Sequence, residues 1–214
     1  PIEHRGVFAQ APIASPADFS RIICMDDSLA APGLLRATNY PAYDRVLAQL
    51  IAHPQGPPVI YSEMPGFGSS ESEAQASLAT LVVVAGAVST NELYVLSLGL
   101  NAMLAEQEPA VFERQMAALC DLLTSTRQCR MLLVTPPPYP QAVDRIRLLA
   151  IAVKRVADAR GIPVADLFTA FKGYGNDAPA LFDPDYLGPS AAGQDLAGRL
   201  IAAVLLQSEG KDQH

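Results

Sequence analysis

Three polar residues, Asp26, Asp27 and Ser28, follow directly on the short apolar run Ile22–Met25. The run is too short for a helix of its own and contains β-branched isoleucines, which is typical of a buried parallel strand. Open α/β sheets bind ligands where their strands end at the carboxyl side. Ser28 is therefore a candidate nucleophile. The alternative is that the three residues form only a polar turn or a helix N-cap.

Polar or glycine residues also follow other expected strands. Gly68 comes after the second strand, Asn101 after the third, and the polar segment 183–190 precedes the last helix. In a doubly wound sheet these places can meet around one crevice. A serine nucleophile, a backbone donor and an amide donor are the parts of an acyl-transfer site with an oxyanion hole.

Strands and helices alternate along the chain, and this alternation positions the polar residues. The expected strands are about 20–26, 57–61, 93–98, 131–134 and 162–167, and the expected helices are about 41–51, 71–88, 109–124, 141–160 and 191–206. Such alternation is typical of βαβ units with helices on both faces of the sheet. The predicted fold class is therefore α/β, a three-layer α/β/α sandwich with about five parallel strands.

The length of 214 residues suits one domain. We expect an extended N-terminal arm over 1–19, the domain over 20–207, and a frayed polar tail over 208–214. The formal net charge of −7 argues against nucleic acid and anionic membrane surfaces as partners. No apolar run is long enough to span a bilayer.

Neither a metal nor a cofactor is predicted. The three cysteines, Cys24, Cys120 and Cys129, lack metal-ligand spacing, and the chain has only three histidines. The glycine-rich loop 62–70 lacks the dinucleotide-binding pattern and a Walker lysine. Three unpatterned cysteines favour the cytosol. Because the chain starts at Pro1, a processed chain that has lost a signal peptide is the alternative.

Five blocks of the sequence together resemble the SGNH (GDSL) hydrolase family over about residues 20–206. These blocks are Asp26–Ser28, Gly68, Gly99–Ala102, Val134–Pro138 and Asp185–Gly193. They correspond to the family's Gly-Asp-Ser, its second-block glycine, its Gly-x-Asn-Asp, a strand followed by prolines, and Asp-x-x-His-x-Ser-x-x-Gly. The resemblance implies the family's flavodoxin-like hydrolase fold.

The resemblance also implies the roles of individual residues. Ser28 would be the nucleophile, and Asp185 would orient a catalytic histidine. The oxyanion-hole donors would be the N–H groups of Ser28 and Gly68 and the side-chain amide of Asn101. No cofactor is implied.

The departures from the family pattern fall on the chemistry. Gly188 stands where the family has its catalytic histidine, Asp26 replaces the first-block glycine, and Ala102 replaces an acid. Glu63 stands where an asparagine is common. Since a serine hydroxyl is a weak nucleophile without a base, activity is expected to be weak or altered.

Two hypotheses of function follow. The first is a serine ester hydrolase or acyl/acetyl transferase acting on small acyl esters or acetylated carbohydrate, with Asp26 or Glu63 as an alternative base. Against that role, Asp26 could simply cap the following turn and Glu63 could face solvent. The second is a pseudoenzyme, a catalytically inactive module of the same fold that binds a protein partner.

Overall fold

The computed structural model describes residues 19–27, 42–51, 56–64, 67–70, 72, 74–75, 91–127, 129–183 and 188–206. The expected arm, apart from Phe19, and the expected tail lie outside these ranges, as does most of the expected helix 71–88. Within that helix, residues 72, 74 and 75 are helical.

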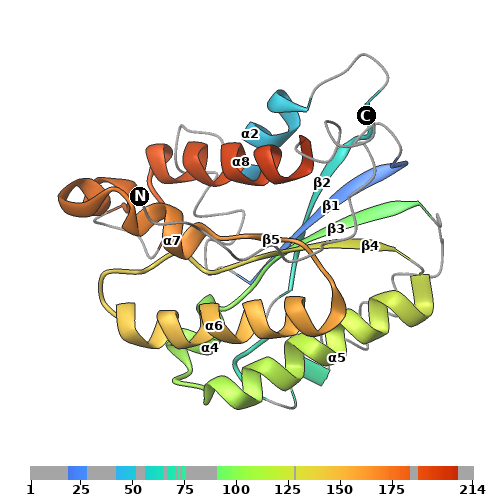
Figure 1. Cartoon of the computed structure of the whole chain (residues 1–214), viewed down its shortest axis with the longest axis horizontal. Coiled ribbons are helices and arrows are strands. Elements are labelled where there is room, and N and C mark those ends of the chain that lie inside the picture. Colours follow the sequence, from blue (N-terminus) through green and yellow to red (C-terminus); the bar gives the residue numbers. More distant parts are fainter. Residues whose placement is uncertain are drawn as a thin grey trace, which may run out of the picture.

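A single parallel sheet of five strands forms the centre of the molecule (Figure 1). The strands are β1 (Arg21–Asp26), β2 (Val59–Glu63), β3 (Glu92–Ser97), β4 (Arg130–Val134) and β5 (Val164–Ala165). Their spatial order is β2-β1-β3-β4-β5. The chain therefore moves outward from β1 to β2 and then returns past β1 to β3, which makes the β1/β3 boundary the topological switch point.

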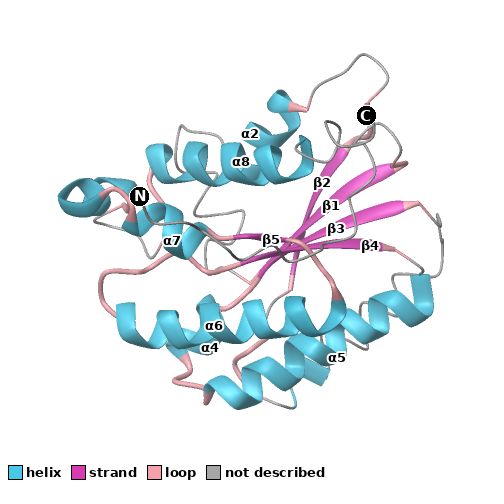
Figure 2. Cartoon of the chain, in the orientation of Figure 1, coloured by secondary structure: helices cyan, strands magenta, loops and turns pink. Residues whose placement is uncertain are grey.

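Helices cover both faces of this sheet (Figure 2). One face carries α2 (Tyr43–Leu50) and α8 (Ala191–Leu206), and the other carries α4 (Leu100–Leu104), α5 (Pro109–Arg127) and α6 (Val143–Arg160). After β5 come α7 (Leu167–Lys172) and the 3₁₀ helix η2 (Gly175–Leu181), which pack into the α2/α8 layer. The predicted three-layer α/β/α sandwich is confirmed.

Each central strand is buried on both faces, which explains its nearly continuous apolar sequence. In β3, Tyr94 and Leu96 point into the core under α5 and α6. Leu93 and Val95 point into the core under α2 and α8. Neighbouring residues of one strand thus hold the two helical layers against the same sheet.

The expected boundaries need several corrections. β2 lies two residues later than predicted, over 59–63, and β5 contains two residues instead of six. β5 ends early because the Asp166 carboxylate accepts a hydrogen bond from the Thr169 N–H and so caps α7. Leu50 of α2 is apolar but 39% exposed, because α8 covers the face formed by Tyr43, Val46 and Leu47.

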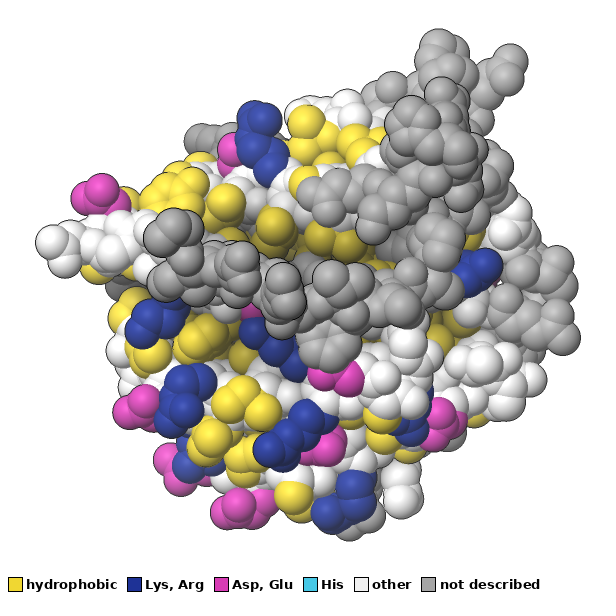
Figure 3. Space-filling model, viewed as in Figure 1, with side chains coloured by type: hydrophobic (Ala, Val, Ile, Leu, Met, Phe, Trp, Pro, Cys, Tyr) yellow, Lys and Arg dark blue, Asp and Glu magenta, His cyan; other side chains and the backbone are white. Residues whose placement is uncertain are grey.

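Basic and acidic side chains alternate over the α6 side of the molecule (Figure 3). Arg155 pairs with Glu113, and Arg160 makes two hydrogen bonds of 2.8 Å to Asp121. These contacts tie α6 to α5 at the surface, where an ion pair contributes roughly 0–1 kcal/mol.

All three cysteines are buried and unbridged. Burial raises the pKa of the Cys24 thiol well above its usual value and that of Cys120 to about 12. Both are therefore unreactive small hydrophobes. Of the helices in the described part of the chain, none combines the length and the apolar character that a membrane crossing requires.

Candidate active site

The Asp27 carboxylate joins the end of β1 to the start of α4. Its Oδ2 accepts hydrogen bonds from the N–H groups of Gly99 at 2.8 Å and Asn101 at 3.2 Å, and its Oδ1 accepts one from Leu100 at 3.2 Å. Asp27 is 4% exposed. Three otherwise orphaned N–H groups at a helix start are thereby satisfied by one buried side chain. The alternative considered from the sequence was a cap of the segment that directly follows these residues, whereas Asp27 binds the start of α4, 72 to 74 positions further along the chain.

Burial raises the pKa of Asp27 from its ordinary 3.8 to about 7, and the charge of Asp26 acts in the same direction. The three backbone N–H groups lower the pKa and only partly offset these effects. A buried carboxyl group with a shifted pKa, next to a cavity and at a switch point, is a frequent mark of a functional site.

Of the predicted site residues, Asn101 donates its N–H to this carboxylate, and Gly68 packs against the next residue of α4. A Cβ atom on Gly68 would be 3.1 Å from the backbone nitrogen of Ala102, which follows Asn101. Gly68 has a φ of 86°, a conformation that side-chain-bearing residues rarely adopt. A glycine is therefore needed here both for the turn and for its close approach to α4.

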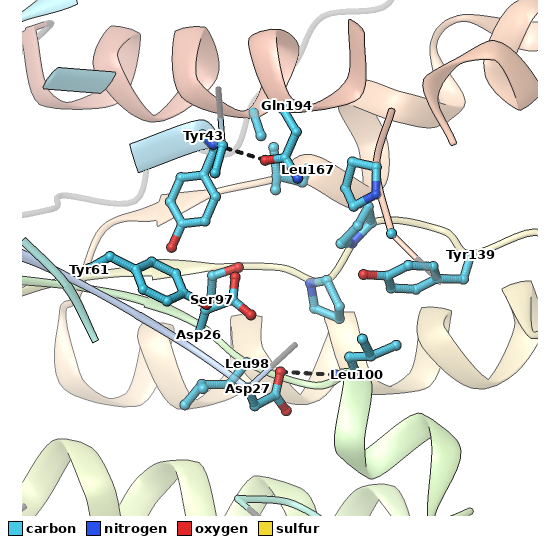
Figure 4. Close-up of a pocket in the computed structure, with 16 residues that line it drawn as sticks. Asp26, Asp27, Tyr43, Tyr61, Ser97, Leu98, Leu100, Tyr139, Leu167 and Gln194 are labelled. Carbon is cyan, nitrogen blue, oxygen red and sulfur yellow. Dashed lines mark hydrogen bonds between the residues drawn. The ribbon is translucent and has the colours of Figure 1, made fainter. Parts of the chain in front are cut away.

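A pocket opens at the carboxyl ends of β1 and β3 and extends up to α2 and α8 (Figure 4). Its lining includes Asp26, Asp27, Tyr43, Tyr61, Tyr139 and Gly188. It offers about 50 Å³ to the centres of water molecules. A single water needs roughly 10–15 Å³ by this measure, so the pocket has room for a few waters or one small chemical group.

The predicted site residues that the structure describes fall into two groups. Gly68 and Asn101 lie against the start of α4 beside Asp27, whereas Gly188 and Asp26 line the pocket together with Asp27. Ser28 and Asp185 lie outside the described residues. The backbone of Glu63 pairs with Asp26 at the end of β2, and its side chain is not among those described.

Gly188 is positioned by contacts on both sides of it. Its carbonyl accepts a hydrogen bond from the Asp183 N–H at 3.0 Å, and the Ser190 N–H donates to the Leu181 carbonyl at 2.9 Å. A Cβ atom on Gly188 would meet nothing within 4 Å. A side chain at this position would therefore project into open space.

Gly193, the last residue of the closing block, has a packing function instead. A Cβ atom there would lie 2.2 Å from the Leu181 carbonyl oxygen, a distance that no side chain tolerates. The glycine lets α8 approach the end of η2, and this close approach brings the segment around Gly188 to the pocket.

Sequence analysis did not find Tyr43, Tyr61, Tyr139 and Gln194, which also line the pocket. Tyrosines on a helix, a strand and a loop carry no motif, and their separation along the chain hides their proximity. Tyr43 and Gln194 begin two helices that share the α2/α8 layer. The polar Gln194 within the otherwise apolar face of α8 was the one available signal.

Among the described residues, no group of three or more His, Cys, Asp or Glu side chains could hold a metal ion. The absence of a metal and of a cofactor from the reaction stays a prediction. The two carboxylates that meet at the pocket, Asp26 and Asp27, are adjacent in sequence, and Asp27 is fully engaged with backbone N–H groups.

A parallel sheet with a buried carboxyl group and a pocket at its switch point defines a flavodoxin-like α/β protein with a candidate active site. The sequence model of the GDSL-like lipase/acylhydrolase family matches residues 27–196. The chain belongs to this family. No curated protein matches the chain by sequence.

Solved structures of esterases and lipases share the fold. The lipase/acylhydrolase from Enterococcus faecalis is 23% identical, with a TM-score of 0.61 over 86% of this chain and 94% of that one. The acetyl xylan esterase AlAXEase is 15% identical, with a TM-score of 0.68 over 86% of this chain and 99% of that one. The psychrotrophic esterase EstA from Pseudoalteromonas sp. is 16% identical, with a TM-score of 0.64 over 88% and 97%.

Proposed function

We propose that the chain is a serine ester hydrolase or acyl transferase for small acyl esters or acetylated carbohydrate, with weak or altered activity. The observation that carries this proposal is the Asp27 carboxylate, which binds the backbone of Gly99, Leu100 and Asn101. It fixes the chain immediately before Ser28 against the start of α4, which bears Asn101. Nucleophile and oxyanion donor would thereby be held in one place, as acyl transfer requires.

In the proposed reaction, the Ser28 hydroxyl attacks the acyl carbon of the ester. The N–H groups of Ser28 and Gly68 and the amide of Asn101 stabilise the negative charge that develops on the carbonyl oxygen. The alcohol then leaves, and water or a second alcohol releases the acyl group from the serine. In the family pattern Asp185 would orient a histidine, so here it would act only on an imidazole that is added or introduced at position 188.

Two carboxylates, Asp26 and Glu63, are the candidates for the base that takes the Ser28 proton. Gly188, at the family's histidine position, has no proton-accepting group. Asp26 lines the same pocket and is the better-placed substitute, and Glu63 is the second. A carboxylate that is partly removed from water can act as a general base.

The second candidate function is an inactive module of this fold that binds a partner. It is favoured by the same Gly188, since loss of one member of a catalytic triad lowers the rate by several orders of magnitude. The two candidates differ in whether Ser28 contributes to any turnover.

Hydrolysis of p-nitrophenyl acetate by the parent protein and by Ser28→Ala separates the two. The ester-hydrolase proposal expects slow turnover that Ser28→Ala abolishes. Asp26→Asn and Glu63→Gln then identify the base, because only the variant that lacks it loses the serine-dependent rate. Equal rates for the parent and Ser28→Ala would leave only the inactive module.

Restoring the missing base gives a second test. In Gly188→His the new side chain enters open space, and the backbone at Gly188 is outside the left-handed region, so the substitution is compatible with the fold. We expect a measurable rise in ester hydrolysis, and a smaller, saturable rise when imidazole is added to the parent. Free imidazole hydrolyses activated esters by itself, so both measurements need Ser28→Ala as the control.

A further inference from the structure

The hydroxyl group of Tyr43 is buried at the wall of the pocket without a hydrogen-bond partner among the described residues. The residue is 6% exposed. Figure 4 shows its ring reaching from α2 towards the strand ends, on the same side as Tyr61, with Tyr139 entering from the opposite side. A buried hydroxyl that is left unpaired is costly, so its retention at a pocket wall points to a ligand.

One polar neighbour of this hydroxyl is the Cys24 thiol. Burial raises the pKa of that thiol, and the Tyr43 hydroxyl lowers it in part. A thiol is a weak donor and a weak acceptor. The contact therefore leaves most of the hydrogen-bonding capacity of the Tyr43 oxygen unused.

The position of Tyr43 is fixed by the packing of α2 on α8. Its backbone N–H donates to Gln194 Oε1 at 2.9 Å, which caps the first turn of α2 from the neighbouring helix. A Cβ atom on Gly198 would lie 3.0 Å from the Tyr43 carbonyl oxygen and 2.6 Å from Val46 Cβ. Because this glycine lets the helices pack so closely, the Tyr43 ring is held in place before any ligand arrives.

The other walls of the pocket define what the ligand must be. Asp26 contributes a carboxylate, which only accepts hydrogen bonds and has about four lone-pair sites. Pro136 and Pro137 contribute apolar surface. An anionic ligand would be repelled by Asp26, and an ammonium group would leave the Tyr43 proton without an acceptor. A neutral hydroxyl group can donate to the carboxylate and accept from Tyr43.

We propose that Tyr43 is a specificity-determining residue that binds a hydroxyl group of the substrate, so that the preferred substrates are short-chain esters of polyhydroxylated alcohols. This inference rests on the proposed ester hydrolysis for its kinetic consequence. The binding of the hydroxyl group itself does not depend on turnover.

Glycerol 1-monoacetate and propyl acetate form a matched pair of substrates, since they have the same acyl group and a three-carbon alcohol and differ by two hydroxyls. We expect kcat/KM to favour the hydroxylated ester in the parent protein. Tyr43→Phe keeps the ring and removes the hydroxyl. It should lower kcat/KM for glycerol monoacetate by roughly 5- to 100-fold and change that for propyl acetate by less than about twofold.

Tyr174→Phe is the control variant, because Tyr174 is 48% exposed and does not line the pocket. It should leave both substrates unchanged. The melting temperature of ligand-free Tyr43→Phe should equal that of the parent or exceed it, since an unpaired buried hydroxyl is being removed. A clear fall in melting temperature, with an unchanged substrate ratio, would make the hydroxyl structural and overturn the proposal.

Binding without turnover separates this inference from the proposed function. Saturation-transfer NMR with glycerol, and with 1-propanol as the reference, reports contact with the protein even if no ester is hydrolysed. We expect a glycerol signal in the parent that weakens in Tyr43→Phe and persists in Tyr174→Phe. If both esters resist hydrolysis while glycerol behaves as expected, only the ester-hydrolase proposal fails. If glycerol binds equally to the parent and Tyr43→Phe, the role of Tyr43 is refuted.

Discussion

The two ends of the parallel sheet each bury a carboxyl group, and the two groups have different hydrogen-bond partners. At the amino end, Glu92 is fully buried, and Arg21 and the Tyr94 hydroxyl both donate to it. At the carboxyl end, Asp27 is held by three backbone N–H groups, and among the described residues no cationic side chain pairs with it. The first carboxyl group is paired with an arginine, whereas burial raises the pKa of the second to about 7.

The comparison shows what separates a structural buried acid from one at a candidate active site. Glu92 begins β3 and accepts hydrogen bonds from Arg21 on β1 and from Tyr94 on β3, so these contacts stabilise the register of β1 on β3. Asp27 lies where β1 has ended, next to a pocket, and its partners among the described residues are Gly99, Leu100 and Asn101 at the start of α4. Its hydrogen bonds position the start of α4, and burying the carboxyl group has a cost in desolvation.

The largest expected effect comes from Asp27→Ala. It leaves three buried N–H groups without an acceptor, each worth roughly 1 kcal/mol or more, so unfolding in urea should show a loss of about 3 kcal/mol. Any Ser28-dependent ester hydrolysis should vanish with it. Asp27→Asn, which keeps one acceptor oxygen, should lose less. Stability within about 0.5 kcal/mol of the parent for Asp27→Ala would show that the loop is held by other contacts.

Arg21→Met tests the opposite end of the sheet. Removing the partner of fully buried Glu92 should lower stability by about 2–3 kcal/mol, somewhat less than for a completely buried pair because Arg21 is partly exposed. Ester hydrolysis should be unchanged, in contrast to Asp27→Ala. The double variant with Glu92→Gln should recover part of the loss. A double variant as unstable as the sum of the single variants would show that the two side chains do not interact.

The pH dependence of stability should come from the carboxyl end. Asp27 has a pKa of about 7 in the folded protein and an ordinary value of 3.8, so between these values the folded state holds a proton that the unfolded state has released. Its contribution to stability is therefore fully present below about pH 4 and is lost as the pH rises to 7. The loss should be on the order of 1 kcal/mol per pH unit.

Asp27→Asn is the control for this titration, because its amide does not ionise. Urea unfolding of the parent and of Asp27→Asn from pH 4.5 to 7.5 should give a difference in stability that changes with pH in the direction described. A difference that stays constant over this range would mean that Asp27 ionises in the folded protein as it does in the unfolded chain.

The smallest expected effect compares two glycines with positive φ. Gly68 has a φ of 86° and packs against Ala102, whereas Gly161, which ends α6, has a φ of 62° and open space around it. Gly161→Ala should cost about 1 kcal/mol for the left-handed conformation alone. Gly68→Ala should cost about 1 kcal/mol more, because Ala102 must move as well. Equal losses in thermal unfolding would show that the loop at Gly68 adjusts freely.

The sequence by itself determined the layers of this protein. The apolar runs before Asp26, Asn101 and Thr135, separated by helical stretches, predicted a parallel sheet with helices on both faces, and the structure confirms it. This worked because strands buried on both faces must be apolar throughout, a pattern that needs no knowledge of distant neighbours. The family blocks were recognisable for a similar reason, since each is one short continuous stretch of the sequence.

Short elements and strand ends were less predictable. α4, α7 and η2 were not predicted, and β5 was expected to be longer than its two residues. Their lengths depend on tertiary contacts, such as the capping of α4 by Asp27 from β1, across 72 to 74 positions of sequence. No local pattern contains such a contact.

Only the tertiary structure decided which side chains share the pocket. Tyr43, Tyr139 and Gln194 come from three separate parts of the chain and meet because α2 packs on α8 above the strand ends. The close packing depends on Gly198, because a side chain there would collide with α2. The sequence does not reveal this role, since it depends on the distance between two helices that are far apart along the chain. Residue type sets what each side chain can do, but the folding of distant segments onto one another decides which side chains can act together.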